Sequence, residues 1–227
     1  SGDVVVTADA AVFAPGDVGK VWRGGGGFGT VTGYTSTTQI TVTLTSAIVE
    51  VIADQPGTAV PVPIYSGQWS LTAPVTTVSG LSHLEGKTVK VLGDGNVFSD
   101  KVVTGGAITL DQPCSRIIVG LGYTAQLQTL DIESAQGTIQ GNRKKIGKLT
   151  VKVQNTRGIK YGPTFSQLTE VKQRGPSVPM GTPIPLFTGS FEVIMDPSWN
   201  VEGRVSIQQD YPLPASILAV APDVEIG

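Results

Sequence analysis

The sequence predicts a mainly β protein, made of two to three small antiparallel barrels or sandwiches with one short helix. The 227 residues include 29 Gly and 15 Pro beside many β-branched residues, a composition typical of short strands joined by many turns. Alternating apolar and polar residues recur between clusters of Gly, Asp and Pro, as half-buried strands require. Apolar residues make up 40% of the chain, which is enough for a packed core. Because Cys114 is the only cysteine, the fold cannot contain an internal disulfide.

Charged residues are scarce and nearly balanced. They make up 15% of the chain and leave a net charge of −2, whereas ordinary soluble domains carry roughly 25%. Proteins that bind nucleic acid are usually basic, so the total charge argues against that class. The apolar run of roughly 18 residues that a membrane-spanning helix needs does not occur, and the first residues lack the pattern of a signal peptide. Because the chain begins directly on a strand, we expect a fragment of a longer protein.

Residues 1–73 form the first expected domain. A strand in "DVVVTADAAVF" opens it, and "GTVTGYTSTTQITVTL" predicts a hairpin because its apolar residues alternate with Thr. The Pro-rich stretch "DQPGTAVPVPIYSGQWSLTAP" predicts a linker or an edge segment, since Pro cannot donate to a central ladder, and places a domain boundary near Pro74. The apolar face of the hairpin consists of Val31, Ile40, Val42 and Leu44.

The run "RGGGGFG" before this hairpin superficially resembles a phosphate-binding loop. It lacks the Gly-Lys-Ser/Thr ending and precedes a hairpin rather than a helix, so the features that bind phosphate are missing. We therefore expect a flexible surface loop. Phe28 within it is a candidate exposed aromatic residue for contact with a partner.

Residues 74–125 form the second expected domain. The stretch "KTVKVLGDG" runs into Gly-Asp-Gly, a strong hairpin-turn pattern. Further strands are predicted in "NVFSDKVVT", "AITLD" and "SRIIVGLGY". Four or five short strands in about fifty residues are typical of a small barrel or sandwich.

Residues 126–227 form the third expected domain, which holds the one predicted helix. Ile139 and Ile146 lie seven residues apart with basic residues between them, and a strand over 149–154 follows. A loop with five prolines then precedes "TGSFEVIMDPSWNVEGRVSIQQD", which predicts a hairpin that turns at "DPS". A last short strand is expected near the end of the chain.

The only histidine, His83, stands in "GLSHLEGKTVKVLGDG" two places before Glu85. In an extended segment these two side chains would share a face, as a catalytic pair requires. No Gly-x-Ser-x-Gly elbow and no second histidine for a metal site occur in the chain. The pattern favours a loop that runs into a strand, and a hydrolase built on His83 and Glu85 is the weakest of three functional hypotheses.

Two other candidate sites are weak. Cys114 has Arg116 two places away, which could activate a thiol, but a small packed residue is the favoured interpretation. Asp94, Asn96 and Asp100 supply a thin set of oxygens without the downstream Glu of a calcium loop. The prediction therefore includes no catalytic residue, no cofactor and no metal.

Positive charge concentrates in "NRKKIGKLTVKV". Cations near the C-terminus of a helix are favourable on their own, so a solvated helix end is the favoured interpretation. An interface with an acidic partner or with DNA is the alternative. The residues concerned are Arg143, Lys144, Lys145 and Lys148.

Four segments together resemble the C-terminal part of a family of tailed-phage structural proteins. They are "SGLSHLEGKTVKVLGDG", "VVTGGAITLDQPCSRIIVGLGY", "NRKKIGKLTVKVQNTRG" and "FTGSFEVIMDPSWNVEGRVSIQQDYPLPASILAV". The family consists of large podovirus-type tail proteins, also found in prophages, and the resemblance is to the nozzle or stabilisation component that closes the tail tube. The segment "GDVGKVWRGGGGFGTVTGYTSTTQITVTL" is similar to the FCCH-like repeat of that family, which implies a small β-barrel over residues 1–73.

The resemblance implies a structural protein of the virion tail, made in the cytoplasm of the bacterial host. It would work as a cyclic homo-oligomer, in contact with other tail proteins and with DNA that passes through the tube. His83 and Glu85 would fix a turn by hydrogen bonds to the backbone, and loops over 24–29 and 162–185 would carry contacts between neighbours.

A host-receptor module that binds a glycan is the alternative function. Such sites favour exposed aromatic residues beside amides and carboxylates. Trp22, Trp69 and Trp199 are the candidate contacts, and Trp199 is favoured because it lies at a predicted turn.

Overall fold

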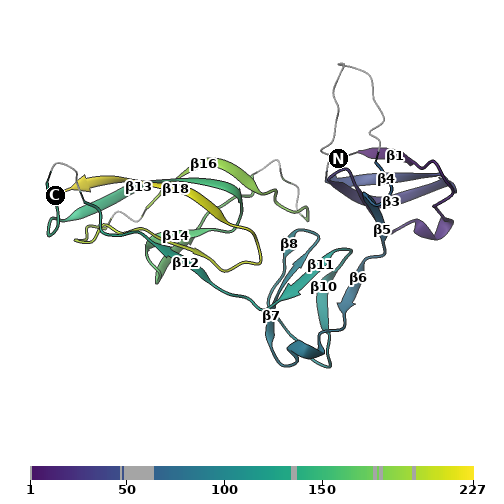
Figure 1. Cartoon of the computed structure of the whole chain (residues 1–227), viewed down its shortest axis with the longest axis horizontal. Helices are drawn as coiled ribbons and strands as arrows, with labels where there is room; N and C mark the ends of the chain where they lie inside the picture. The colour runs from purple at the N-terminus through teal and green to yellow at the C-terminus, as the bar shows by residue number, and fades with distance from the viewer. Residues whose placement is uncertain are drawn as a thin grey trace, which may run out of the picture. The chain divides into compact units, whose positions relative to one another are not determined.

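A computed structural model shows the chain as a series of antiparallel β-sheets (Figure 1). Contacts within the chain separate two units. Unit 1 comprises Ser1–Glu85 and Val103–Ile118, and unit 2 comprises Gly86–Val102 and Val119–Gly227. The expected division into three domains, after residues 73 and 125, stays a prediction. The described residues are 2–46, 48, 64–133, 137–175, 178, 181–195 and 198–227.

The mainly β fold class is confirmed. Within the described residues no helix reaches seven residues, and none is long and apolar enough to cross a membrane. The helical segments described are two short 3-10 turns, η1 (Pro15–Asp17) and η2 (Ser82–Leu84).

Unit 1 is built on a five-stranded antiparallel sheet with the order β1-β4-β3-β2-β5. The predicted hairpin is β3–β4, and its apolar face is confirmed, because Val31 pairs with Val42 and both are buried together with Ile40. The two ends of this order do not pair in the described part of the chain, so the sheet is open and the barrel that the resemblance implies is not closed. The strands are β1 (Asp3–Thr7), β2 (Val21–Gly24), β3 (Gly27–Ser36), β4 (Gln39–Ser46) and β5 (Trp69–Thr72).

The predicted flexible glycine loop is instead a tight turn between β2 and β3. Gly24 ends β2 and Gly27 begins β3, so only Gly25 and Gly26 connect the strands. Both have positive φ angles, +55° and +76°, as a two-residue type I′ turn requires. Glycine suits these two positions because a Cβ atom disfavours that backbone conformation.

Unit 1 also contains a two-stranded sheet formed by β6 (Val75–Val78) and β10 (Ile108–Cys114). In unit 2, β7 (Thr88–Gly93) pairs with β8 (Asn96–Val97) and with β9 (Lys101–Val102). Asp94 and Gly95 connect β7 to β8 with positive φ angles of 48° and 81°, which confirms the predicted Gly-Asp-Gly turn. The strand predicted in "SRIIVGLGY" is β11 (Ile117–Gly120).

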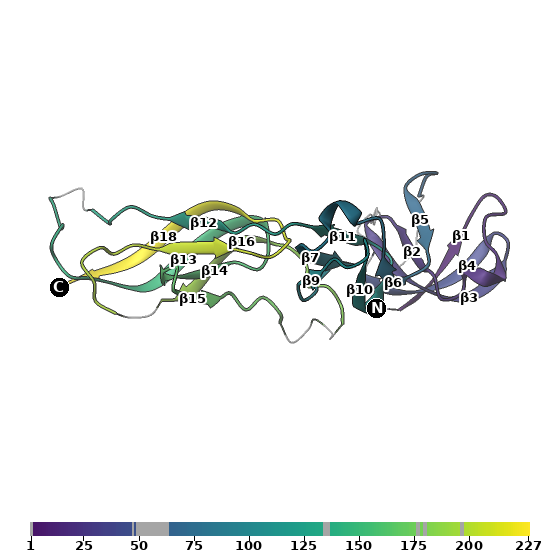
Figure 2. The ribbon, with the colours of Figure 1, turned by 90° about the horizontal axis from the view of Figure 1, so that it is seen from below.

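The larger part of unit 2 is a β-sandwich. One sheet has the order β12-β17-β14-β15 and the other the order β16-β13-β18. Figure 1 shows these sheets as two layers, and β13, β16 and β18 run side by side there and in the turned view of Figure 2. The strands are β12 (Ala125–Gln128), β13 (Lys144–Thr156), β14 (Lys160–Thr164), β15 (Gln167–Glu170), β16 (Phe187–Ile194), β17 (Ser206–Gln209) and β18 (Ser216–Ile226).

The sandwich core lies between the two layers. β13 contributes Leu149, Val151 and Val153 at alternate positions, all of them at most 1% exposed. These side chains belong to one cluster with Ile159 of the β13–β14 connection and Ile207 of β17. The period of two along β13 therefore separates its buried face from its solvent face, as in other two-layer β structures.

The helix expected around Ile139 and Ile146 is wrong. Residues 137–143 contain no helix, only a turn and bend over 140–142, and β13 begins at Lys144. β13 extends this far because its first residues pair with the last residues of β18: Lys144 lies opposite Ile226 and Ile146 lies opposite Val224. A cross-strand ladder with a distant segment decided the conformation, against the local seven-residue spacing.

Three more expectations for this region are corrected. The predicted hairpin after the proline-rich loop is not formed, because β16 pairs with β13 while β17 pairs with β12 and β14 of the other sheet. Asp196 and Pro197 of its expected turn lie outside the described residues. The last strand is long rather than short, since β18 has eleven residues. The first part of the predicted proline-rich loop holds the β14–β15 hairpin.

Candidate functional site

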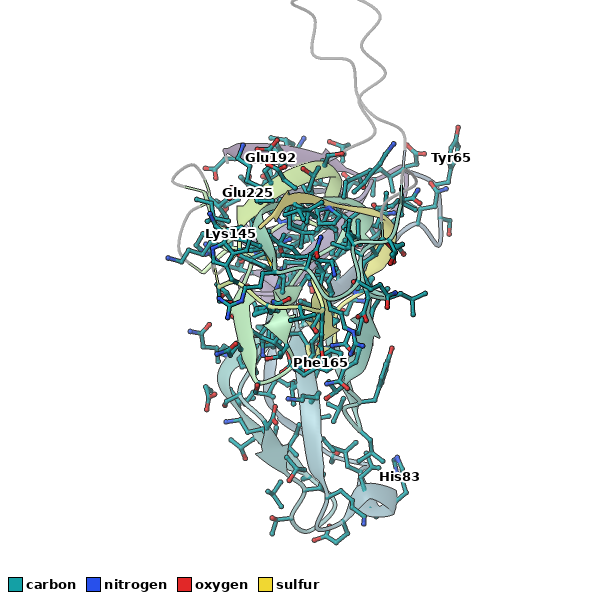
Figure 3. The ribbon with its side chains drawn as sticks, turned by 90° about the vertical axis from the view of Figure 1, so that its left-hand side faces the viewer. Tyr65, His83, Lys145, Phe165, Glu192 and Glu225 are labelled. Atoms are coloured by element: carbon teal, nitrogen blue, oxygen red, sulfur yellow. The ribbon has the colours of Figure 1, made fainter. Side chains whose placement is uncertain are left out.

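Glu85 stabilises the turn that contains Gly105 and Gly106. Its carboxylate accepts hydrogen bonds from the backbone N–H groups of Gly105 (2.9 Å) and Gly106 (2.7 Å), so two successive amides of the turn hold one anion. His83 lies in η2, and its exposed ring projects from the ribbon (Figure 3). Of the two residues, Glu85 makes the backbone hydrogen bonds that the family resemblance implies.

Phe28 lies in β3, directly opposite Arg23 of β2. The guanidinium carbon of Arg23 is 4.5 Å from the centroid of the Phe28 ring, and its Nη2 donates a hydrogen bond to Ser115 Oγ (2.9 Å). This cation–π contact covers part of the aromatic ring. An interaction role for Phe28 stays a prediction, now for a residue of a paired strand rather than of a loop.

The adjacent residues Lys144 and Lys145 have opposite environments. Lys144 is 1% exposed, and its ammonium group donates a hydrogen bond to the carbonyl of Val201 (2.8 Å). Its backbone N–H and C=O both pair with Asn200. Lys144 therefore holds the segment around residue 200 against β13, and its charge does not form part of an exposed basic surface.

Lys145 contacts one other predicted interaction residue, Trp199, and one acidic residue, Glu225. Its Nζ is 3.1 Å from a carboxylate oxygen of Glu225 and 5.9 Å from the centroid of the Trp199 ring. Figure 3 shows Lys145, Glu225 and Glu192 on the same side of the sandwich. Trp199 is 46% exposed, and Arg143, two residues before Lys145 in the chain, is also exposed. We call Trp199, Lys145 and Glu225 the Trp199 cluster.

The other two tryptophans, Trp22 and Trp69, are less exposed to solvent than Trp199. Trp22 is 1% exposed in the core of unit 1. Trp69 is partly buried and packs against Phe13, with ring centroids 5.8 Å apart. Of the three candidate tryptophans, Trp199 has the exposure that a glycan contact needs.

Of the remaining candidate residues, Cys114 is buried, and Asp100 and Asn96 form hydrogen bonds within the protein. Cys114 is 4% exposed at the end of β10. The carboxylate of Asp100 accepts a hydrogen bond from Lys90 Nζ at 2.9 Å, and the amide nitrogen of Asn96 is 3.4 Å from the carbonyl oxygen of Gly181. In the described ranges, no group of three His, Cys, Asp or Glu side chains is placed to hold a metal ion.

A polar network in unit 2 was missed by the sequence reasoning. Lys160 Nζ is 2.7 Å from a carboxylate oxygen of Asp210 and 5.2 Å from the centroid of the Tyr211 ring, and the Tyr211 hydroxyl donates to Glu170 (3.1 Å). The hydrogen bond with Asp210 raises the pKa of Lys160. Burial, followed by the hydrogen bond to Glu170, raises the pKa of Tyr211. Both groups are held protonated near neutral pH, so the network ties strands together rather than supplying a base.

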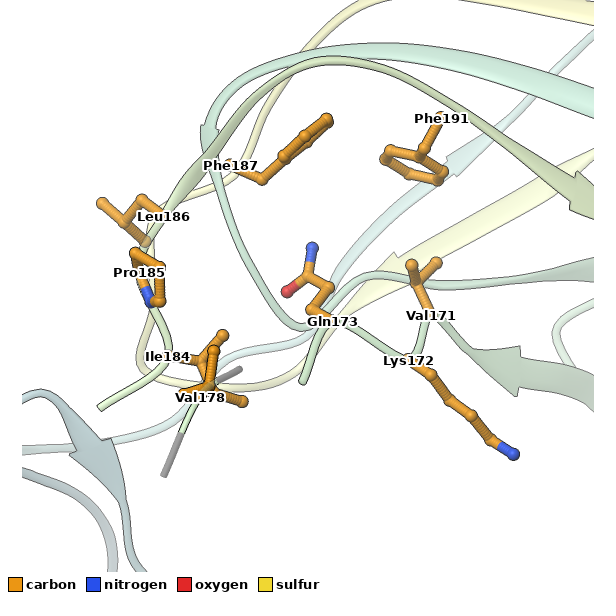
Figure 4. A pocket seen from close by; sticks show the side chains of 9 residues that line it. All are labelled: Val171, Lys172, Gln173, Val178, Ile184, Pro185, Leu186, Phe187 and Phe191. Atoms are coloured by element: carbon orange, nitrogen blue, oxygen red, sulfur yellow. The ribbon is translucent and has the colours of Figure 1, made fainter. Parts of the chain in front are cut away.

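An open apolar pocket of about 300 Å³ lies between the segment after β15 and the start of β16 (Figure 4). Phe187 and Phe191 meet edge to face on its wall, with ring centroids 6.1 Å apart. Leu186 and Phe187 are 44% and 40% exposed. We call it the 171–191 pocket; it is lined by Val171, Lys172, Gln173, Val178, Ile184, Pro185, Leu186, Phe187 and Phe191.

Gln173 places an amide in this apolar wall. Its Oε1 accepts a hydrogen bond from the N–H of Gly158 (3.1 Å), which fixes the orientation of the amide. Its Nε2 points toward the side where Phe187 and Phe191 lie (Figure 4). That nitrogen is buried and has no acceptor within the described residues. A buried donor left without an acceptor costs about 1–3 kcal/mol, so an incoming acceptor would be stabilised here.

Cations border the same pocket. Arg157 is 8% exposed and donates to the carbonyls of Gly95 (3.1 Å) and Ile184 (2.5 Å). Arg174 donates to the carbonyl of Thr182 (3.1 Å). Burial, and then the nearby charge of Arg174, lower the pKa of Arg157, because both disfavour a charged guanidinium. The exposed Lys172 lines the pocket, Arg174 follows it on the same segment, and Arg157 contacts the backbone of the lining residue Ile184.

No known family model matches the sequence, and no curated protein matches it.

Proposed function

We propose that the protein is a structural component of a bacteriophage tail, of the nozzle type that closes the tail tube. It works through contacts between the β-units of neighbouring subunits in an oligomeric ring. The segments that resemble podovirus-type tail proteins motivate this proposal. Its partners are further copies of the chain, other tail proteins and the DNA that passes through the tube, and its place is the virion tail.

The observation that carries the proposal is the long free edge of one sandwich sheet. β18 spans eleven residues and pairs with β13 on one side, while no strand of the described residues pairs with its other side. An open edge of this length presents unpaired backbone N–H and C=O groups and associates readily with another chain. A subunit of a closed assembly covers such an edge, and an isolated monomer leaves it exposed.

The test is electron microscopy of the protein, with its mass measured in solution over a range of concentrations. A ring with a central channel supports the nozzle function. A three-fold spike would instead point to a tip or fibre protein. A monomer at every concentration, in the intact protein, would overturn the proposal.

The second candidate function is recognition of a host-surface glycan, and the Trp199 cluster favours it. An exposed indole beside an ammonium and a carboxylate offers a stacking surface for a sugar ring together with polar groups for its hydroxyls. The exposed Arg143 lies two residues before Lys145 in the chain.

Binding to a glycan array tests this second candidate. Trp199→Ala should abolish any binding that the native protein shows, whereas Tyr123→Ala, at a side chain 82% exposed elsewhere in unit 2, should leave it unchanged. Equal loss in both variants, or no binding by the native protein, would contradict a glycan site at Trp199.

A further inference from the structure

The 171–191 pocket combines three properties that define what fits it. Its wall is mostly apolar and open, with Leu186 and Phe187 more than a third exposed. It holds one buried amide donor, Gln173 Nε2, without an acceptor in the described part of the chain. Its borders carry cations, among them Arg157 and Lys172. The matching occupant has an apolar side chain, a carbonyl beside it and acidic residues close by.

The two units of the chain are complementary in charge. Unit 1 has seven acidic and three basic residues, a net charge of −4, and unit 2 has eleven acidic and thirteen basic residues, a net charge of +2. Unlike net charges favour contact between unit 1 of one copy and unit 2 of another and disfavour contact between two copies of unit 1. The pocket belongs to the positive unit.

In unit 1, the edge strand β1 has the features that the pocket requires. β1 pairs only with β4 in the described residues, so its other edge has backbone carbonyls without a strand partner. Val5 is 63% exposed at its centre and alternates onto the same face as the exposed Asp3. Asp9, also exposed, follows the strand.

We propose that the 171–191 pocket binds the β1 edge of a second copy of the chain, with Val5 against Phe187 and Phe191. A carbonyl of that edge accepts the hydrogen bond of Gln173 Nε2, and Asp9 faces Lys172. The contact joins unlike surfaces, so it repeats head to tail and closes a ring if the rotation allows. It rests on the proposed function as an oligomeric tail component and names one interface of that assembly.

Sedimentation of the native chain and of matched variants tests the interface. Val5→Asp should weaken self-association about tenfold or more by placing a charge in the apolar contact. Val18→Asp, at another valine of unit 1 that is 50% exposed, should leave it unchanged. An equal effect of both substitutions, or of neither, would overturn the interface.

A charge exchange tests the pairing from both sides. Lys172→Glu and Asp9→Lys should each weaken self-association, and an equal mixture of the two variants should restore it, because the altered pocket then meets the altered edge. Circular dichroism checks that each variant is folded. A mixture as weak as the separate variants would contradict the proposed pairing.

Cross-linking distinguishes contacts between copies from contacts within one chain. Val5→Cys combined with Leu186→Cys, with the buried Cys114 replaced by Ser, should form disulfide-linked oligomers under mild oxidation. Cross-linked monomers alone would overturn the proposal. If microscopy shows a ring that persists in Val5→Asp, this interface fails while the proposed function stands; if the native protein forms no assembly, both fail.

Discussion

The sheet of unit 1 and the sandwich of unit 2 bury their cores in different ways. The sandwich places aliphatic side chains of two sheets face to face, with β13 at the centre of one layer. The unit 1 core includes bulky aromatic residues, Trp22 of β2 and Phe13 of the segment before η1, each at most 4% exposed. The sandwich core is mostly aliphatic, with Tyr161 and Met195 as its other buried members, whereas the unit 1 core combines aliphatic residues with two buried aromatic side chains.

This difference predicts that a core substitution in one unit leaves the other folded. Leu149→Ala removes a fully buried side chain at the centre of β13, and we expect it to destabilise the sandwich by about 2–5 kcal/mol. Thermal unfolding followed by far-UV circular dichroism should show this loss. Tryptophan fluorescence, read in a Trp199→Phe background, should keep its native midpoint, because the remaining Trp22 and Trp69 both lie in unit 1. A joint shift of both midpoints would show that the two units unfold as one.

Within unit 2, two neighbouring lysines sharpen the contrast between a buried and an exposed position. Lys144→Met removes the hydrogen bond to the Val201 carbonyl, and we expect a loss of about 1–3 kcal/mol in the free energy of unfolding. Lys145→Met removes a partly exposed ion pair and should change it by about 0.5 kcal/mol or less. Urea unfolding measures both values. Equal effects would contradict the structural role of Lys144.

In unit 1, Glu85 and His83 form a similar pair for comparison. Glu85→Ala removes the acceptor of two backbone N–H groups in an exposed turn, and we expect a loss of about 1 kcal/mol. His83→Ala, in the 3-10 turn η2 directly before Glu85, should stay within about 0.5 kcal/mol of the native protein. Urea unfolding of both variants decides this. A larger loss of stability in His83→Ala than in Glu85→Ala would show that Glu85 is not the side chain that stabilises this region.

The smallest expected effects concern the dependence of stability on pH. They affect unit 1 at acid pH and unit 2 at alkaline pH. In unit 1, a hydrogen bond from Lys20 and one from the Ala14 N–H lower the pKa of Asp17. This stabilisation is therefore present above the ordinary value of 3.8 and is lost as the pH falls through the lowered pKa. In unit 2 the pKa of Lys160 is raised, so its contribution is present below 10.5 and is lost as the pH rises through the raised pKa.

Thermal melts across pH test these signs. Asp17→Asn should flatten the acid side of the stability profile and leave its alkaline side unchanged. Lys160→Met should flatten the alkaline side alone. An acid effect of Lys160→Met, or an alkaline effect of Asp17→Asn, would show that the assignment of the two groups is wrong.

The sequence by itself determined the alternation of the β3–β4 hairpin and the Gly-Asp-Gly turn between β7 and β8. Val31, Ile40 and Val42 alternate with Thr, and this local period of two is sufficient to place them on one buried face. Asp94 and Gly95 also act locally, because the positive φ angles of the turn depend on these residue types. The candidate Trp199 was accessible to the same reasoning, since it was expected at an exposed turn.

Only the tertiary structure decided which strands pair and which polar residues meet. β16 and β17 follow each other in the chain but belong to different sheets, and β13 begins at Lys144 because β18 pairs with it there. The network of Lys160 and the 171–191 pocket likewise join residues that no short motif connects. The physical reason is that alternation places a side chain on a face, whereas the partner of that face is set by contacts far away in the sequence.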